Sequence, residues 1–197
     1  MNPIRLLLSA ALLALLPLGF ARAAETYSID PVHSSISFKV RHLGVSNVAG
    51  RFETVGGTFT YDEADPAKIA ISLKIETGTV STNNPDRDKH LKSPDFFNVA
   101  QFPAITFTST SVKVGTKAAT DDGTPYDITG DLSFNGVTKS VTLPVRFLGT
   151  GKGMKGETRA GGEAQFTIKR SDYGMKGFLP AVGDDVAVTV EIEGVQQ

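Results

Sequence analysis

Apolar and polar side chains alternate with a period of two along most of the chain after residue 23. In residues 34–42, Ile36, Phe38 and Val40 share one face, while polar and charged side chains share the other. Such alternation is typical of an antiparallel strand with one buried face and one solvent-exposed face. The same alternation, in places weaker, predicts further strands in residues 26–29, 52–61, 68–76, 105–114, 126–134, 137–147, 164–169 and 186–193.

Asn135-Gly136 joins two of these predicted strands and is the strongest short signal for a β-hairpin. Many alternating strands with few long crossovers predict a β-sandwich or a closed barrel. Closure removes the open edges that long strands would otherwise expose. We therefore expect an all-β fold, an antiparallel up-and-down barrel of about eight strands, whose interior is filled by side chains or holds one small ligand.

Residues 84–98 interrupt the strand pattern with helical sequence. Asn84 can cap a helix, Pro85 suits its first position, and Pro94 ends the turn. The dense charge run at residues 86–92 leads directly into Phe96 and Phe97. We expect one or two short helical turns that act as a lid, with the two aromatic rings in the barrel mouth and charged groups at its rim.

Residues 1–23 have the features of a secretory signal peptide. Arg5 precedes an apolar run at residues 6–20, and Ala21-Arg22-Ala23 matches a small-residue cleavage site. The run is shorter than the roughly 20 residues that span a bilayer, although an uncleaved anchor is the alternative. We expect cleavage near Ala23, a mature domain at residues 24–197, and a periplasmic location.

The composition narrows the range of functions. The chain has 20 Lys+Arg and 21 Asp+Glu, a formal net charge of −1, which excludes a nucleic-acid binder that works by global positive charge. The absence of cysteine excludes disulfide scaffolds, thiolate catalysis and cysteine-based metal sites. Because the sequence also has no H-x-H or H-E-x-x-H motif, we expect no metal and no cofactor.

The 3 histidines are the candidates for polar chemistry. Asp30, His33 and Ser34 could form a catalytic set in space, but no spacing supports it, and the sequence has no G-x-S-x-G motif. His42 falls on the apolar face of its strand, where it either hydrogen-bonds to neighbouring groups or orients a ligand. An enzyme that acts on a lipid-like substrate through His42 or His90 is therefore an alternative to a binding protein.

Several segments together resemble one known family, the YceI-like family of secreted, polyisoprenoid-binding, lipocalin-like proteins. In order, they are YSIDPVHS (27–34), ISFKVRH (36–42), GRF (50–52), RDKHLKSPDFF (87–97), FP (102–103), ITF (105–107), GDLSFNGVTK (130–139), IKRSDYGM (168–175) and VGDDV (182–186). The resemblance covers residues 26–193. It implies an eight-stranded lipocalin-like barrel with an elongated pocket for an isoprenoid or similar amphiphilic lipid, and a non-enzymatic role in lipid carriage, storage or stress response.

With this resemblance, the apolar strand faces and the lid become the expected ligand lining: Ile36, Phe38, Val40, Phe52, Ile71, Leu73, Phe96, Phe97, Ile105, Phe107, Leu132, Phe134, Phe166, Ile168, Val188 and Val190. For the polar head group we expect His33, His42, Arg87, His90 and Arg170, because arginine can donate two hydrogen bonds to a phosphate. Asp172 is placed to pair with Arg170.

The expected partner is a long-chain isoprenoid, a prenyl quinone or a fatty lipid, with no nucleic acid and no stable membrane insertion. Whether the protein forms a homodimer stays open, since no residue pattern supports one. An outer-membrane barrel would instead carry aromatic girdles, an outward apolar face and a polar lumen. The absence of tryptophan and the aromatic content of 8% argue against that alternative.

Overall fold

The structure, a computed structural model, describes residues 24–62, 64–115 and 122–197, so the predicted signal peptide lies outside the described residues. Strands dominate: β1 (Glu25–Ile29), β2 (Ser35–His42), β3 (Ser46–Phe52), β4 (Val55–Tyr61), β5 (Ala70–Glu76), β6 (Val80–Ser81), β7 (Ala104–Val114), β8 (Thr124–Phe134), β9 (Val137–Lys152), β10 (Thr158–Lys169) and β11 (Val182–Gln196). The helical elements are η1 (Pro66–Lys68), η2 (Thr77–Thr79), α1 (Pro85–Leu91) and η3 (Arg170–Tyr173).

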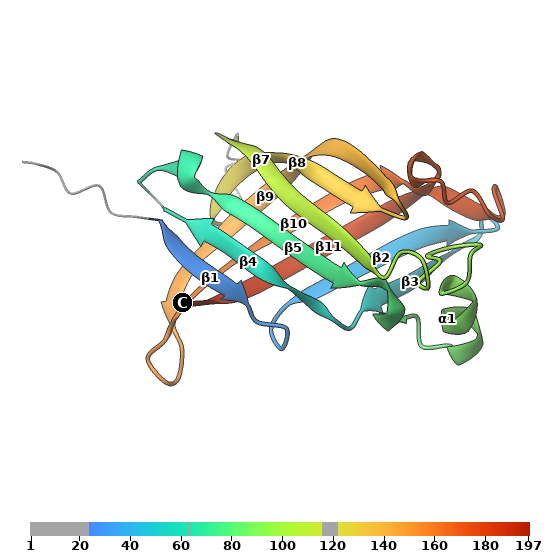
Figure 1. The fold of residues 1–197 in the computed structure, drawn as a ribbon, viewed down its shortest axis with the longest axis horizontal. Helices are drawn as coiled ribbons and strands as arrows, with labels where there is room; N and C mark the ends of the chain where they lie inside the picture. The colour runs from blue at the N-terminus through green and yellow to red at the C-terminus, as the bar shows by residue number, and fades with distance from the viewer. Residues whose placement is uncertain (1–23, 63, 116–121) are drawn as a thin grey trace, which may run out of the picture.

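These strands close into one antiparallel barrel (Figure 1). Two pairs of short strands each act as one long strand: β1 and β2 follow one another along β11, and β3 and β4 follow one another along that composite strand. Similarly, β6 continues the line of β5 and pairs with β3. Counted this way, the wall is eight-stranded with neighbours in chain order, so the predicted all-β up-and-down barrel is confirmed.

The barrel has two distinct ends (Figure 1). One end, called the α1 end here, carries α1, the turn between β2 and β3, the turn between β8 and β9, and the loop at residues 174–181. The opposite end carries the connection from β4 to β5, the turn between β9 and β10, and the C-terminus. Among the described residues, no helix is long and apolar enough to cross a membrane.

Strand β8 shows how the sequence pattern becomes a barrel wall. Tyr126, Ile128, Leu132 and Phe134 are buried inside, whereas the polar residues between them face outward. Gly130 continues the inward set, and a Cβ there would lie 2.5 Å from the ring of Phe107 on β7. The glycine therefore lets an aromatic ring lie across the strand inside the barrel.

Turn and cap chemistry also follow the sequence. Asn135 and Gly136 have φ values of 50° and 77°, the left-handed pair that a two-residue hairpin turn requires. Asn84 accepts a hydrogen bond from the backbone N–H of Arg87, and Pro85 begins α1. The helix is a single short segment, so the expected helical lid is present as α1, and Phe96 and Phe97 lie in the turns that follow it.

Candidate functional site: an apolar cavity along the barrel

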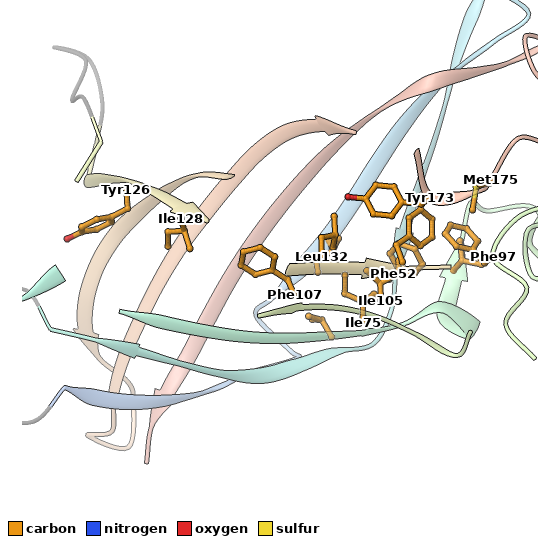
Figure 2. Close-up of a cluster of buried hydrophobic side chains, with 14 of the residues drawn as sticks. Phe52, Ile75, Phe97, Ile105, Phe107, Tyr126, Ile128, Leu132, Tyr173 and Met175 are labelled. Carbon is orange, nitrogen blue, oxygen red and sulfur yellow. The ribbon is translucent and has the colours of Figure 1, made fainter. Parts of the chain in front are cut away.

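A cavity of about 230 Å³ lies inside the barrel and is lined almost entirely by apolar side chains. Figure 2 shows buried side chains spread along the barrel from Tyr126 to Met175, both of which line the cavity. The lining on β8 runs from Tyr126 to Phe134, eight residue steps. At about 3.4 Å per residue and a strand tilt of about 40°, these steps span about 20 Å along the barrel axis.

That length sets the size of chain that the cavity could accept. An extended chain advances about 1.2 Å per bond, so about 20 Å corresponds to roughly 17 bonds, or about four isoprene units. The shape is therefore that of a site for one chain end rather than for a compact molecule.

Each apolar side chain expected from the sequence lines this cavity: Ile36, Phe38, Val40, Phe52, Ile71, Leu73, Phe96, Phe97, Ile105, Phe107, Leu132, Phe134, Phe166, Ile168, Val188 and Val190. Further lining residues were not part of the expected ligand lining, although Tyr126, Ile128 and Phe147 fall on the apolar faces of predicted strands: Phe59, Tyr61, Leu91, Tyr126, Ile128, Phe147, Met175 and Val182. Most of these stand at inward positions of the same strands, so the alternation alone could have found them.

Aromatic side chains close the opposite end of the cavity. Tyr61 and Phe147 stack there with ring centroids 3.5 Å apart and planes 15° apart. Tyr61 and Tyr126 are both buried, as is Ile69 beside them in the lining. The opposite end is therefore an apolar floor.

The aromatic cluster at the α1 end differs from the floor because not all of its rings come from the barrel strands. Phe97 meets Phe52 edge-on at 5.4 Å, and Phe134 lies 5.8 Å from Phe97 and 5.3 Å from Tyr173. Phe97 belongs to the turns after α1 and not to a barrel strand, so part of the closure at this end comes from outside the barrel wall.

Arg170 brings a charge to the cavity at the α1 end. Its side chain is buried, with 2% exposed. The guanidinium donates to three backbone carbonyls: Nε to Gly183 at 2.8 Å, Nη1 to Met175 at 3.0 Å and Nη2 to Val182 at 2.7 Å. Burial lowers the pKa of this guanidinium, and nearby Asp184 partly opposes the shift, yet an arginine stays protonated at any physiological pH.

The predicted pairing of Arg170 with Asp172 is wrong. Asp172 lies 3.3 Å from Lys139 instead, and Asp184 accepts hydrogen bonds from the backbone and side chain of Ser171. Since a guanidinium has five N–H groups, two of those on Arg170 have no protein partner among the described residues. The lining at the α1 end therefore includes one buried arginine, whose guanidinium is held by backbone carbonyls.

Two other predicted head-group residues hold neighbouring loops and do not line the cavity of the described residues. His33 is exposed in the turn after β1, where Nδ1 lies 2.8 Å from Asp30 and 3.4 Å from Arg159. Arg87 donates from Nε to the hydroxyl of Thr82 and from Nη2 to its carbonyl, at 2.7 Å each. His33 lies in a turn and Arg87 on α1, so neither side-chain direction follows the strand alternation.

Asp30, His33 and Glu193 place three ligand atoms within 4.8 Å of one another. Arg159 already fills this cluster, because Nη1 donates to Asp30 at 2.8 Å and also to Glu193. Hydrogen bonds from His33 and from Arg159 hold the pKa of Asp30 well below its usual value of 3.8. The cluster is thus an ion network centred on Arg159 that joins the turn after β1 to β10 and β11.

The remaining two histidines also stand outside the cavity lining of the described residues. His42 is half-buried at the last position of β2, beyond the register shift between Val182 and Val186 on β11. His90 lies on α1, with Nε2 3.0 Å from Asp95 and its ring edge-on to Phe96 at 5.1 Å. Of the five expected head-group residues, only Arg170 reaches the cavity.

A closed antiparallel barrel with an apolar cavity, an aromatic floor and a helical lid defines a lipocalin-like barrel. Comparison with sequence profiles of protein families matches residues 27–194 to the YceI-like domain. The chain belongs to this family.

Similar proteins agree in length and fold. Protein YceI of Escherichia coli O157:H7 is 45% identical over 181 residues, which cover 91% of each chain. The crystal structure of the Campylobacter jejuni YCEI protein is 28% identical, with a TM-score of 0.67 over 80% of this chain and 90% of that one. A domain from Saccharophagus degradans, described as polyisoprenoid-binding and implicated in plant cell wall breakdown, has a TM-score of 0.63 at 19% identity, over 87% of this chain and 98% of that one.

Proposed function

We propose that this protein binds a long-chain isoprenoid or a similar amphiphilic lipid inside the barrel and acts as an exported carrier or storage protein. The observation that carries the proposal is the apolar cavity, about 20 Å long by strand geometry, with one buried guanidinium at its α1 end. A polyisoprenoid-binding description of the S. degradans neighbour supports the same ligand class. The ligand would be a prenyl quinone, a prenyl phosphate or a fatty lipid.

The energetics favour such a ligand. Burial of apolar groups contributes about 0.8 kcal/mol per CH₂, so a chain of about 17 bonds gains on the order of 10 kcal/mol. Ordering the flexible chain and immobilising the molecule offset part of this gain. A net binding free energy near −8 kcal/mol corresponds to micromolar affinity, roughly what a carrier needs to take up and release its cargo.

The orientation follows from the two ends of the cavity. The tail would reach the aromatic floor at Tyr61, Tyr126 and Phe147, and the head would stop near Arg170. Three N–H groups of that guanidinium donate to backbone carbonyls. We propose that the other two reach carbonyl or phosphate oxygens of the ligand, since charge-assisted hydrogen bonds are the stronger kind. A prenyl phosphate is therefore expected to bind more tightly than the prenyl alcohol of equal chain length.

The export half of the proposal rests on residues 1–23. We propose that they direct the chain to the periplasm and are removed near Ala23. N-terminal sequencing of the protein from a periplasmic fraction tests this. A mature N-terminus near residue 24 supports export, and an intact Met1 in the cytoplasm contradicts it.

A cavity-filling pair of variants tests ligand binding. Ala164 lines the cavity on β10, whereas Ala187 is exposed on the outer face of neighbouring β11. Ala164→Phe should weaken binding of a prenyl quinone to delipidated protein at least tenfold, and Ala187→Phe should leave the affinity within twofold. Urea unfolding checks that both variants are folded. Equal affinity in the two folded variants would place the ligand outside the barrel.

The alternative enzymatic function has less structural support. Neither His42 nor His90 lines the cavity of the described residues, so neither contacts the space proposed for the lipid. We propose that the protein returns its lipid chemically unchanged. A modified lipid that forms with the native protein, and no longer forms with His42→Ala or His90→Ala, would establish the enzyme instead.

A further inference from the structure

The α1 end of the barrel exposes several large apolar side chains to solvent. The turn between β2 and β3 contributes Leu43 and Val45, which are 61% and 81% exposed, and the loop before β11 contributes Phe178 and Leu179, 52% and 39% exposed. The two segments are joined, because the N–H of Leu43 donates to the carbonyl of Ala181 at 2.7 Å. We call these four apolar residues the rim patch.

The rim patch is continuous with the cavity lining. The ring of Phe178 stacks on Phe96 with centroids 5.7 Å apart and planes 4° apart, and Phe96 lines the cavity. The carbonyl of Phe178 also accepts from the N–H of Val182 at 2.8 Å, and Val182 is a second lining residue. An apolar path therefore leads from the exposed surface to the interior, through the lid segment that carries Phe96.

Unpaired positive charges flank the rim patch. Arg41 lies two residues before Leu43, and Lys176 lies two residues before Phe178, while Lys89 and Lys92 lie on and just after α1. None of these four cations forms an ion pair within the described part of the chain. The apolar residues thus stand among cations that are free to meet an anionic surface.

The acidic groups at the same end are mostly occupied. Asp95 pairs with His90 at 3.0 Å, and Asp88 accepts from both the backbone and the hydroxyl of Thr82. On the exposed surface of α1, Asp86 is the acidic side chain that remains. Hydrogen bonds do not remove these charges, so Asp86, Asp88 and Asp95 balance Arg87, Lys89 and Lys92. The excess positive charge at the rim comes from Arg41 and Lys176, although the chain as a whole carries a formal net charge of −1.

We propose that the rim patch docks the barrel onto an anionic lipid bilayer. The four apolar side chains would enter the interface, and Arg41, Lys89, Lys92 and Lys176 would contact lipid head groups. A bilayer offers both an apolar interior and a negative surface, the combination that this rim matches. A second copy fits less well, because a twofold contact would bring the same cations together.

Docking would also place the lid at the membrane. Phe178 packs on Phe96, so insertion of Phe178 between lipids would weaken the ring contact that holds the lid over the cavity. The lipid could then enter tail first, with its head stopping near Arg170. This inference rests on the proposed function, because it assigns the rim as the entrance for the same ligand.

The test uses the full mature chain and two kinds of vesicle: phosphatidylcholine alone, and equal parts of phosphatidylcholine and phosphatidylglycerol. We expect cosedimentation with the anionic vesicles, at least fivefold more than with the neutral ones and weakened by salt. The rim variant Leu43→Ser/Val45→Ser, which leaves the Phe178–Phe96 contact intact, should lower binding at least fivefold. The matched control, Val32→Ser/Leu148→Ser, removes exposed apolar side chains elsewhere and should bind as the native protein does.

Two further measurements separate this inference from the proposed function. Uptake of a prenyl quinone from detergent solution should be equal in the rim variant and the native protein, whereas transfer from anionic vesicles should slow at least fivefold. Equal vesicle binding by the rim and control variants would overturn the docking proposal. A concentration-dependent dimer that disappears in the rim variant would overturn it in favour of a second copy. Failure of all forms to take up lipid from detergent would instead refute the proposed function.

Discussion

Replacing Arg170 with methionine tests whether the buried guanidinium holds the α1 end of the barrel together. Its three hydrogen bonds reach Met175, Val182 and Gly183, so one side chain ties η3 to the following loop and to the start of β11. Methionine keeps an unbranched side chain but donates no hydrogen bond. The three carbonyls would then lose their charged donor.

The expected loss follows from these contacts. A buried acceptor left without its donor costs about 1–2 kcal/mol, so three acceptors cost about 3–6 kcal/mol. Removing the guanidinium also removes the penalty of burying a charge, which offsets part of the loss. We expect the free energy of unfolding to fall by about 3 kcal/mol. Arg170→Lys should recover part of it, because an ammonium group cannot reach three carbonyls in the planar geometry of a guanidinium.

Urea unfolding followed by circular dichroism measures this loss, with Arg51→Met as the matched control. Arg51 is exposed and pairs with Glu53 on the surface, so its replacement should cost less than about 1 kcal/mol. A loss for Arg170→Met no larger than that of the control would refute the structural role of the guanidinium.

Two other predictions concern the barrel wall. Gly57 has a φ of 133°, and a Cβ there would lie 2.0 Å from the carbonyl oxygen of Ser72, so Gly57→Ala should lower the free energy of unfolding by about 3 kcal/mol. Gly56→Ala has open space and should cost much less; equal losses in urea melts would contradict this. His33 and Arg159 hold the pKa of Asp30 in the folded protein below the value of 3.8 expected for the unfolded chain. The ionised Asp30 therefore stabilises the fold fully above pH 3.8, and this stabilisation is lost as the pH falls through the lower pKa of the folded protein. Unfolding free energies from about pH 5 to about pH 2 should therefore decline less steeply in Asp30→Asn, and an unchanged slope would show that Asp30 is not responsible.

The inward face of each strand could be predicted from the sequence because alternation along a strand survives folding, but the alternation left open whether the interior is filled or hollow. Once the sheet closes, each inward position of a strand such as β8 faces the same interior, whatever its distant neighbours are. The expectation that Phe107, Leu132 and Phe134 share one lining needed only the alternation of side chains along their strands. The size of the cavity depends on how facing rings pack, as Tyr61 and Phe147 do, and no local pattern contains that information.

Four of the five residues expected at the head group lie outside the cavity lining, at positions where the strand alternation stops. By alternation His42 should face the interior, but the register between β2 and β11 shifts just before that residue. His33 lies in a turn, and its Arg159 neighbour is 126 residues away along the chain. Arg170 was expected near the head group from the family resemblance. Its backbone partners could not be predicted, since the pattern of side chains does not show which carbonyl groups will lie nearby. The exposed Phe178 could not be predicted either, because it lies in a loop without periodicity.

The most direct test of the account is native mass spectrometry of the protein purified from its own cells without added lipid. We expect a mass above that of the mature chain by one amphiphilic lipid, and we expect Ala164→Phe to carry much less of it than Ala187→Phe. A spectrum of the bare polypeptide, together with no uptake of prenyl quinones or prenyl phosphates by the same sample, would contradict the account.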